Sequence, residues 1–413
     1  MKKLIQLIIL FISFAYSKGG IVSGFISDSS SGEALIGANV MIQETGQGMA
    51  TDINGYYIIQ NINPGSYTLM ASYVGFRVRR IQIIILDKES IKKDIEMVED
   101  LVQLTQVDVT AEKLQRRNNI QPSKINLSPR MMKAAPALAE PDLFRTIQAL
   151  PGVLTTSEYS TGLVIRGGNT DQNLIMLDGI TVYNPSHLGG VFSNFIVDGV
   201  KEAELIKGAY NAEYGGRLSA VLNVISREGN QKEFKGKANI SLLSAQTTLE
   251  GPFYKGAWIL SGRRTYFDLV LPKVLPDNIA TNIPPYFFYD VQGHIFSDIS
   301  SKDRLSLSYY TGIDDILFDT FGLDGRWGNN TISGHWRRVF SERLVGNFLV
   351  ANSNFRTMFG LGGDGGLVND NIIDDRTISA DLSWFKTPDL TIKFGFQNKI
   401  LGFEYFSEFQ DST

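Results

Sequence analysis

The last part of the chain, residues 230–413, alternates apolar and polar residues with a period of two. The pattern is clearest in Leu305–Tyr309, Ile378–Trp384 and Thr391–Ile400. Side chains of a strand point to opposite faces in turn, so each run predicts a strand with one apolar face. Roughly eight such runs of about ten residues, separated by polar turns, are typical of a transmembrane β-barrel, although a soluble β-sandwich gives the same alternation.

Residues 18–103 show shorter alternating runs between turn residues. The stretch Tyr56–Phe76 predicts two strands around Asn63-Pro64-Gly65, and Asp52–Gly55 predicts a further turn. Several short strands at this spacing indicate a small β-sandwich.

Residues 136–229, within a predicted domain of residues 115–229, predict a compact α/β unit. A short helix is expected after Pro141-Asp142, with Leu143, Ile147 and Leu150 on one face and Pro151-Gly152 as its end. The following LVIRGGNTDQNLIMLDG, Leu163–Gly179, predicts a hairpin of two apolar strands around a glycine-rich turn. In Leu218–Ile225 both faces are apolar, so we expect that strand to be covered on both sides.

A polar connector, residues 104–114, contains the short β-prone stretch Thr105–Ala111. It can pair with the exposed sheet edge of another protein, or it can be the last strand of the sandwich. The spacing alone leaves both alternatives open.

The first 17 residues have the pattern of a signal peptide. Lys2 and Lys3 precede an apolar core, Leu4–Phe14, and Ala15-Tyr16-Ser17 is a small-x-small cleavage sequence. A membrane anchor is the alternative, but this core is shorter than the roughly 20 residues of a spanning helix. We expect an exported chain that begins near residue 18.

Composition narrows the possible functions. The net charge is -4, with 43 acidic and 39 basic residues, which gives no reason to expect nucleic acid as a partner. The chain has no cysteine, so thiolate catalysis and cysteine-bound zinc are excluded. Aromatic residues at 11% and 40 glycines suit turn-rich β structure.

Candidate chemistry is sparse. Gly360–Gly365 fits G-x-G-x-x-G but lacks a strand-to-helix context, and the three histidines are scattered, so neither predicts a nucleotide or zinc site. Asp314, Asp315 and Asp319 predict an acidic loop, solvated or holding calcium, of which the solvated loop is the simpler interpretation. We predict no catalytic residue, no cofactor and no resident metal, and therefore no enzyme.

Two further patterns carry a family resemblance. The stretch Val22–Phe76, which begins with VSGF and ends with VGF, resembles the carboxypeptidase regulatory-like domain, a seven-stranded sandwich without catalytic residues. Three segments resemble, in this order along the chain, the plug domain of TonB-dependent outer-membrane receptors: Leu143–Val153, Leu163–His187 and Val200–Asn230. The stretch Gly256–Leu271, GAWILSGRRTYFDLVL, resembles the opening of their barrel. The expected fold is multidomain and mainly β: a β-sandwich, an α/β plug and part of an antiparallel transmembrane β-barrel.

The resemblance also implies roles for particular residues. The connector corresponds to the TonB box, which a periplasmic energy-coupling protein of the TonB type binds; its residues are Thr105, Gln106, Val107, Asp108, Val109, Thr110 and Ala111. The plug motifs comprise Arg166, Gly167, Gly168, Asp178, Gly179, Tyr214, Gly215, Gly216 and Arg217. We expect Arg166 to pair with acidic groups of the barrel wall or of the plug, unless it is an ordinary solvated arginine, and Tyr214–Arg217 to pack toward the barrel.

The function implied is energy-coupled uptake of a scarce or bulky nutrient, such as a metal chelate, oligosaccharide or peptide, across the outer membrane. Outer-membrane lipid and a surface substrate-binding lipoprotein are the other implied partners. The alternative is a surface-binding protein of the adhesin kind. Barrels that enclose a plug have about 22 strands, and the roughly 180 residues after the plug suffice for about eight, so we expect the N-terminal part of a longer receptor.

Overall fold

The computed structural model describes residues 19–100, 124–136, 140–157, 160–274, 276, 285–318, 322–362, 366–388 and 390–409. They form two compact units, one built around the N-terminal sandwich and one in which the plug and most of a large sheet pack together. The predicted signal peptide and the Thr105–Ala111 segment lie outside the described residues. Both remain predictions.

The N-terminal unit contains the predicted β-sandwich, made of two four-stranded sheets. In one sheet β1 pairs antiparallel with β4 and parallel with β7 and β8, and the other runs in the order β3-β2-β5-β6. The strands are β1 Gly20–Asp28, β2 Asn39–Ile42, β3 Gly48–Ala50, β4 Tyr56–Ile62, β5 Gly65–Ser72, β6 Arg79–Ile85, β7 Ser90–Lys92 and β8 Ile95–Met97.

Apolar side chains from both sheets form a single core. Val22 and Ile26 of β1 lie with Val40 of β2 and Leu69 of β5, all fully buried or nearly so. The predicted turn after Asp52 is confirmed: its carboxylate accepts the amides of Asn54 and Tyr56, both at 2.8 Å. This is the side-chain turn that aspartate favours between strands.

The plug is a small α/β unit around a five-stranded sheet of order β13-β12-β17-β16-β9, with two two-stranded pairs, β10-β11 and β14-β15. Its strands are β9 Lys124–Leu127, β10 Val153–Thr155, β11 Leu163–Ile165, β12 Leu174–Leu177, β13 Ile180–Thr181, β14 Ser186–His187, β15 Phe192–Ser193, β16 Val200–Ile206 and β17 Val221–Ser226. Its helices are α3 Pro129–Ala134, α4 Leu143–Gln148 and the 3-10 turns η1 Thr170–Gln172 and η2 Val197–Gly199.

The predicted Leu163–Gly179 hairpin is wrong in one respect, because its two strands do not pair with each other. β11 pairs with β10, whereas β12 lies between β13 and the parallel strand β17, which occupy both of its edges. The glycine-rich turn and η1 carry the chain from one sheet to the other. All four residues of β12 are buried, which explains why the segment is apolar on both faces.

The strand predicted at Leu218–Ile225 is confirmed at its core. β17 is central in the sheet, between β12 and β16, and five of its six residues are buried. Leu218 precedes the strand and is 82% exposed, so the strand is shorter at its start than the apolar pattern predicts.

The predicted helix α4 begins directly after Asp142. One carboxylate oxygen of Asp142 accepts the Arg145 amide at 3.0 Å, which is the capping bond of a helix start. The other accepts the amide of Ser193 at 2.7 Å and so joins the helix to β15. Leu143 and Ile147 are fully buried in the plug core.

We expect Asp142→Ala to destabilise α4 by about 2 kcal/mol, because it removes the cap and leaves the buried Ser193 amide without its acceptor. Hydrogen exchange of the α4 amides measures the change. Asp142→Asn keeps a side-chain acceptor and should lose less. Equal protection in Asp142→Ala and the native chain would contradict this role.

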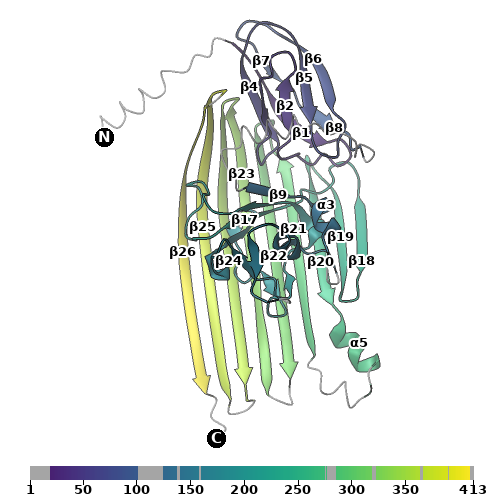
Figure 1. The fold of residues 1–413 in the computed structure, drawn as a ribbon, viewed down its shortest axis with the longest axis vertical. Coiled ribbons are helices and arrows are strands. Elements are labelled where there is room, and N and C mark those ends of the chain that lie inside the picture. The colour runs from purple at the N-terminus through teal and green to yellow at the C-terminus, as the bar shows by residue number, and fades with distance from the viewer. Residues whose placement is uncertain are drawn as a thin grey trace, which may run out of the picture. The chain divides into compact units, whose positions relative to one another are not determined.

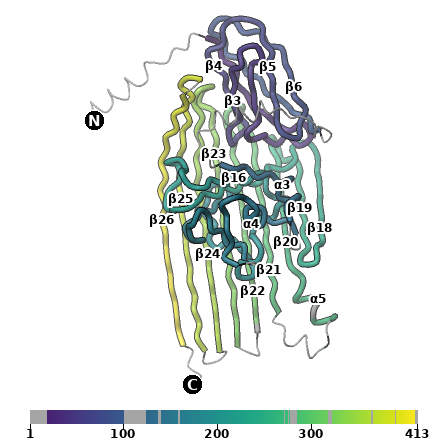
Figure 2. The backbone as a smooth tube through the Cα atoms, in the orientation of Figure 1, coloured from purple at the N-terminus to yellow at the C-terminus, as the bar shows by residue number. Residues whose placement is uncertain are grey.

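The remaining strands form one antiparallel sheet, here called the wall, in sequence order from β18 to β26, as the ribbon in Figure 1 and the tube in Figure 2 show. This makes nine strands where the sequence predicted roughly eight. They are β18 Lys235–Ile240, β19 Ser244–Phe253, β20 Gly256–Thr265, β21 Tyr286–Asp298, β22 Asp303–Phe318, β23 Leu323–Ser341, β24 Leu344–Leu361, β25 Leu367–Thr387 and β26 Leu390–Phe409. A helix, α5 Phe267–Val274, follows β20.

The two faces of the wall differ. The face turned away from the plug carries large exposed apolar side chains at alternate positions: Leu260, Leu305, Leu307, Tyr309, Ile332, Val350, Ile378 and Ile400. The other face packs on the plug. The predicted period of two is therefore confirmed as a difference between the faces.

Helices that could cross a membrane are missing from the described part of the chain, where none is both long enough and apolar enough.

Candidate functional site

The plug motif Arg166-Gly167-Gly168 forms the turn after β11. Arg166 and Gly167 both have left-handed φ angles, of 49° and 82°. Gly168 lies against Ser219, whose Cβ would be 2.5 Å from an added Cβ, so a side chain does not fit there. The Arg166 side chain is exposed, with its guanidinium beside Gly208 of the plug. Pairing of Arg166 with the wall stays a prediction.

Asp178-Gly179 forms the predicted tight turn, between β12 and β13. Both residues have left-handed φ angles, of 48° and 80°, which is the geometry of a two-residue type I′ hairpin. The Asp178 carboxylate also accepts the amide and hydroxyl of Ser226, at 2.8 and 2.6 Å. The turn is thereby held to the end of β17.

Tyr214–Arg217 lies in the stretch that leads to β17. Tyr214 packs on a small cluster within the plug that contains Met176 and Val221. An added Cβ at Gly215 or Gly216 would meet no atom within 4 Å. The packing seen at Tyr214 is therefore with the plug itself, whereas the family resemblance implies packing toward the barrel.

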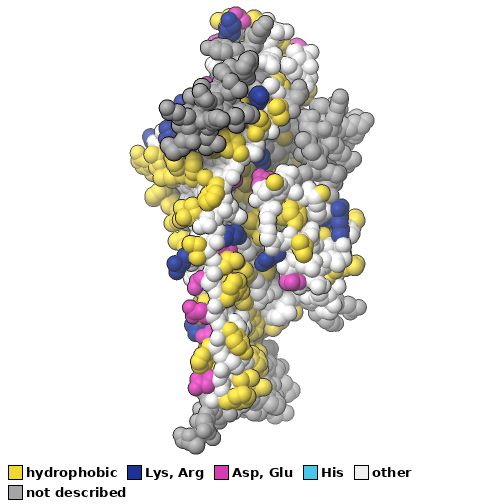
Figure 3. Space-filling model, turned by 90° about the vertical axis from the view of Figure 1, so that its left-hand side faces the viewer, with side chains coloured by type: hydrophobic (Ala, Val, Ile, Leu, Met, Phe, Trp, Pro, Cys, Tyr) yellow, Lys and Arg dark blue, Asp and Glu magenta, His cyan; other side chains and the backbone are white. Residues whose placement is uncertain are grey.

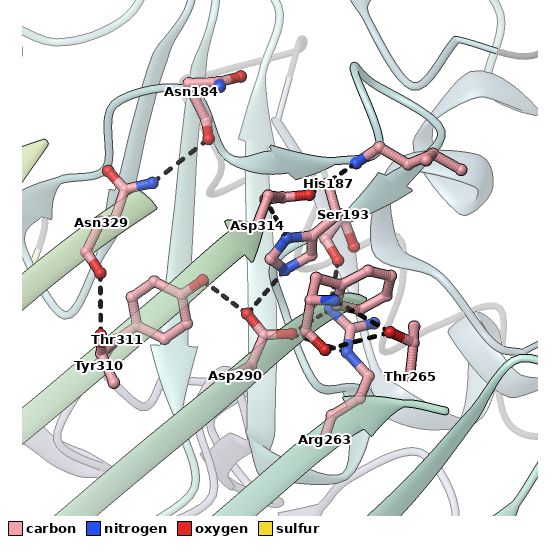
Figure 4. Close-up of polar contacts among 12 residues, drawn as sticks. Asn184, His187, Ser193, Arg263, Thr265, Asp290, Tyr310, Thr311, Asp314 and Asn329 are labelled. Carbon is pink, nitrogen blue, oxygen red and sulfur yellow. Dashed lines mark hydrogen bonds and ion pairs between the residues drawn. The ribbon is translucent and has the colours of Figure 1, made fainter. Parts of the chain in front are cut away.

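A buried ionic cluster joins the plug to the wall and is the most specific polar arrangement in this unit (Figure 4). The plug supplies Glu140 and His187, and the wall supplies Arg263 of β20, Asp290 of β21 and Asp314 of β22. All five side chains are at most 2% exposed. Charges this deep are tolerated only when they are paired and hydrogen-bonded.

Arg263 is the centre of the buried ionic cluster. It donates to Asp290 Oδ2 through Nε at 2.8 Å and Nη2 at 2.5 Å, and to Glu140 Oε1 through Nη1 at 2.7 Å. Nη2 also donates to the carbonyl of Ser193 at 2.7 Å. One wall arginine thus bonds a wall carboxylate, a plug carboxylate and the plug backbone. Such planar, multiple donation is particular to arginine.

His187 bridges two wall carboxylates. Its Nδ1 lies 2.7 Å from Asp314 Oδ2, its Nε2 lies 2.8 Å from Asp290 Oδ1, and its ring stacks on Phe288 at 4.1 Å. Because ionised carboxylates only accept hydrogen bonds, both nitrogens donate when His187 is an imidazolium. Burial alone lowers the pKa of His187, but the two carboxylates outweigh it and raise the pKa above its ordinary value.

Two tyrosines complete the hydrogen bonds of these carboxylates. Tyr310 donates to Asp290 Oδ1 at 2.9 Å, and Tyr286 donates to Asp314. The amide of Leu188, in the plug, also donates to Asp314 at 2.9 Å. The carboxylates are therefore saturated with donors from both the plug and the wall.

A second group of hydrogen bonds joins the plug to the wall at β13 and the residues after it. Ser353 of β24 donates to the carbonyl of Thr181 at 2.8 Å, and Tyr183 donates to Asp375 of β25 at 3.0 Å. Lys399 of β26 donates to the Thr181 hydroxyl at 2.9 Å. With further hydrogen bonds of the same kind, the plug is bonded to each of the nine strands of the wall, from β18 to β26.

The prediction of an acidic loop at Asp314 and Asp315 is wrong. Both residues lie within β22, where alternation turns Asp314 toward the plug and Asp315 to the opposite face, 3.9 Å from Arg326. Asp319, the third member, is outside the described residues. Three aspartates close in sequence therefore do not make one site.

Sequence reasoning missed the buried ionic cluster. Its members are far apart in the chain, and each looks like an ordinary charged residue in its own segment. The one available signal was a lone carboxylate inside an aromatic strand, as in the run YFFYDVQ around Asp290. In the described ranges no group of three or more histidine, aspartate or glutamate side chains is arranged to hold a metal ion.

Comparison with known families identifies the first two domains. The CarboxypepD_reg-like domain matches residues 22–109, and the TonB-dependent Receptor Plug Domain matches residues 128–221. The first match reaches into the predicted TonB-box segment, and the second lies inside the predicted plug of residues 115–229.

Curated relatives match about half of the chain. TonB-dependent receptor P26 of Formosa agariphila is 29% identical over 52% of this chain, and the TonB-dependent transporter Oar of Myxococcus xanthus is 23% identical over 55%. The matched region is 22% of each relative's own length. Both relatives are named as a receptor or a transporter rather than an enzyme.

Solved structures share the fold. A variant of the ferric enterobactin receptor of Pseudomonas aeruginosa aligns with a TM-score of 0.52 and 16% identity over 68% of this chain and 49% of that one. The alcaligin outer-membrane receptor of Bordetella pertussis aligns with a TM-score of 0.52 and 12% identity, over 71% of this chain and 49% of that one. The chain thus combines a CarboxypepD_reg-like domain, a TonB-dependent receptor plug and a strand wall of receptor fold, and its curated relatives are TonB-dependent receptors and transporters.

Proposed function

We propose that this chain acts, as part of an outer-membrane receptor, in the energy-coupled uptake of a scarce or bulky nutrient. The observation that carries the proposal is a plug bonded through the buried ionic cluster to the inner face of a wall whose outer face is apolar. An apolar band on one face of alternating strands suits lipid contact, and a plug on the other face suits a gated passage.

The proposed coupling step acts through the connector. A periplasmic protein of the TonB type adds Thr105–Ala111 as a strand to its own sheet and transmits energy from the inner-membrane proton gradient. Ligand binding on the far side of the plug makes the segment available, and pulling on it moves the plug. A surface lipoprotein that delivers the ligand is consistent with this scheme.

The alternative is a surface-binding protein that does not transport. In that case the sandwich domain makes the contacts and the strands only anchor the chain. The two functions differ in whether Thr105–Ala111 is needed, so that segment is the one to test.

We expect Val107→Pro to abolish binding of the periplasmic domain of the host's TonB-type protein, because proline lacks the amide that an added strand must donate. Binding to the detergent-solubilised chain can be measured by surface plasmon resonance. Val107→Ala keeps the amide and should bind about as well as the native segment.

The same pair of variants, introduced into the gene in the host, separates the two functions. Growth on a limiting ferric chelate, oligosaccharide or peptide should fail with Val107→Pro if the protein is a transporter. Unchanged growth together with unchanged surface adhesion would favour the adhesin alternative and contradict the proposed coupling.

A further inference from the structure

The strands of the wall continue past the plug at the end that carries α5 (Figures 1 and 2). Four bonds to the plug fix which face of each strand is turned inward. They are made by Asn329 of β23, Ser353 of β24, Asp375 of β25 and Lys399 of β26. Since side chains alternate along a strand, every second residue counted from these four faces the same side as the plug.

Counting by twos beyond the plug places an aromatic surface on that side. It consists of Trp327, Phe355, Phe359, Phe403, Tyr405 and Phe409, here called the aromatic wall. Trp327 packs in a cluster with Phe192 of the plug, which confirms its direction. Phe403, Tyr405 and Phe409 are 69%, 71% and 77% exposed, so their rings are accessible.

The positions between these rings are uncharged. Beyond these four plug contacts, out to the far ends of β23, β24, β25 and β26, the inward residues of the described chain include no aspartate, glutamate, lysine or arginine. Polar residues there are amides and hydroxyls, such as Asn369, which accepts the Tyr405 hydroxyl at 3.2 Å. The inner face is therefore apolar and neutral, with hydrogen-bonding groups.

The same segments carry many charges on their other face. Arg356 pairs with Asp370 at 2.6 Å, Asn354 bonds Asp374, and Glu404 occupies an alternate position of β26. Figure 3, which looks onto the β26 side, shows charged side chains gathered on the side away from the plug and apolar ones below the plug. The lack of charge is thus a property of the inner face.

We propose that the aromatic wall binds an uncharged oligosaccharide. Ring faces pack against the C–H faces of a sugar, and the neighbouring amides and hydroxyls match its hydroxyl groups. An anionic chelate or acidic oligosaccharide would enter a surface with no cation to pair with it, which disfavours it. This inference rests on the proposed function, for which it names the class of nutrient.

The test is calorimetric titration of the full chain in detergent with maltohexaose, cellohexaose and laminarihexaose, beside two anionic probes, hexaguluronate and a ferric tricatecholate. We expect at least one neutral hexasaccharide to bind and both anionic probes to bind more weakly. The double variant Phe403→Ala/Tyr405→Ala should weaken the neutral binding about tenfold. Phe406→Ala, on the opposite face of the same strand and 54% exposed, should not.

Failure of every neutral hexasaccharide to bind at millimolar concentration overturns the inference, as does equal or tighter binding of an anionic probe. Unchanged affinity in the double variant also overturns it. Unchanged thermal unfolding of the double variant excludes misfolding as the cause of lost binding. No energy-coupling protein takes part in this titration, so its outcome is separate from that of the Val107→Pro experiment.

Discussion

Arg263→Ala is expected to cost the plug-bearing unit about 3–5 kcal/mol, because it removes one partner of a buried, paired set of charges. The change leaves Glu140 and Asp290 as buried carboxylates without their guanidinium, and it leaves the Ser193 carbonyl without its donor. The loss is measured as the change in the free energy of unfolding in detergent. This free energy is obtained from a urea titration in which hydrogen exchange of the plug strands reports unfolding.

The adjacent arginine supplies a matched control. Arg264 is on the opposite face of β20, its side chain is 39% exposed, and it pairs with Asp268 at 2.7 Å. An exposed pair of this kind contributes about 1 kcal/mol or less, so Arg264→Ala should have a small effect. Similar losses from both substitutions would show that general damage to β20, and not the buried ionic cluster, accounts for the result.

His187 is expected to make the plug less stable as pH rises. Its ring bonds Asp290 and Asp314 directly. These carboxylates are in turn bonded by Arg263, Tyr286 and Tyr310. The raised pKa means that the folded state binds the proton more tightly than the unfolded state does. Its stabilisation is complete below the ordinary value of 6.5 and is lost as pH rises through the folded-state pKa.

His187→Gln provides the comparison, because its amide fills part of the same space and does not titrate. The difference in unfolding free energy between the native chain and His187→Gln, measured from about pH 5.5 to about pH 9, should shrink with rising pH. A difference that stays constant over this range would contradict an imidazolium in the buried ionic cluster.

Local features of the fold were readable from the sequence because they depend on neighbouring residues. The Asp142 helix start, the Asp52 and Asp178-Gly179 turns and the alternation of the wall strands all follow from residues a few positions apart. The pairing of β11 and β12 was mispredicted because an apolar strand does not reveal which neighbour it pairs with. The partners of β12 are β13 and β17, and β17 is more than forty residues further on.

The buried ionic cluster could not be predicted for a similar reason. Whether Asp314 is solvated or buried depends on which face of β22 meets the plug, and that is fixed by contacts with residues more than a hundred positions away. Asp314 and Asp315 are indistinguishable in sequence, yet one is buried beside His187 and the other lies on the opposite face near Arg326.

The order of the wall strands has a consequence for how the chain folds. Neighbouring strands of the sheet are also neighbours in sequence, so each pairing joins segments that are close along the chain. Closing such short loops costs little conformational entropy. The bonds from His187 to Asp290 and Asp314 instead join residues more than a hundred positions apart, so we expect the hairpins of the wall to form before the plug docks on them.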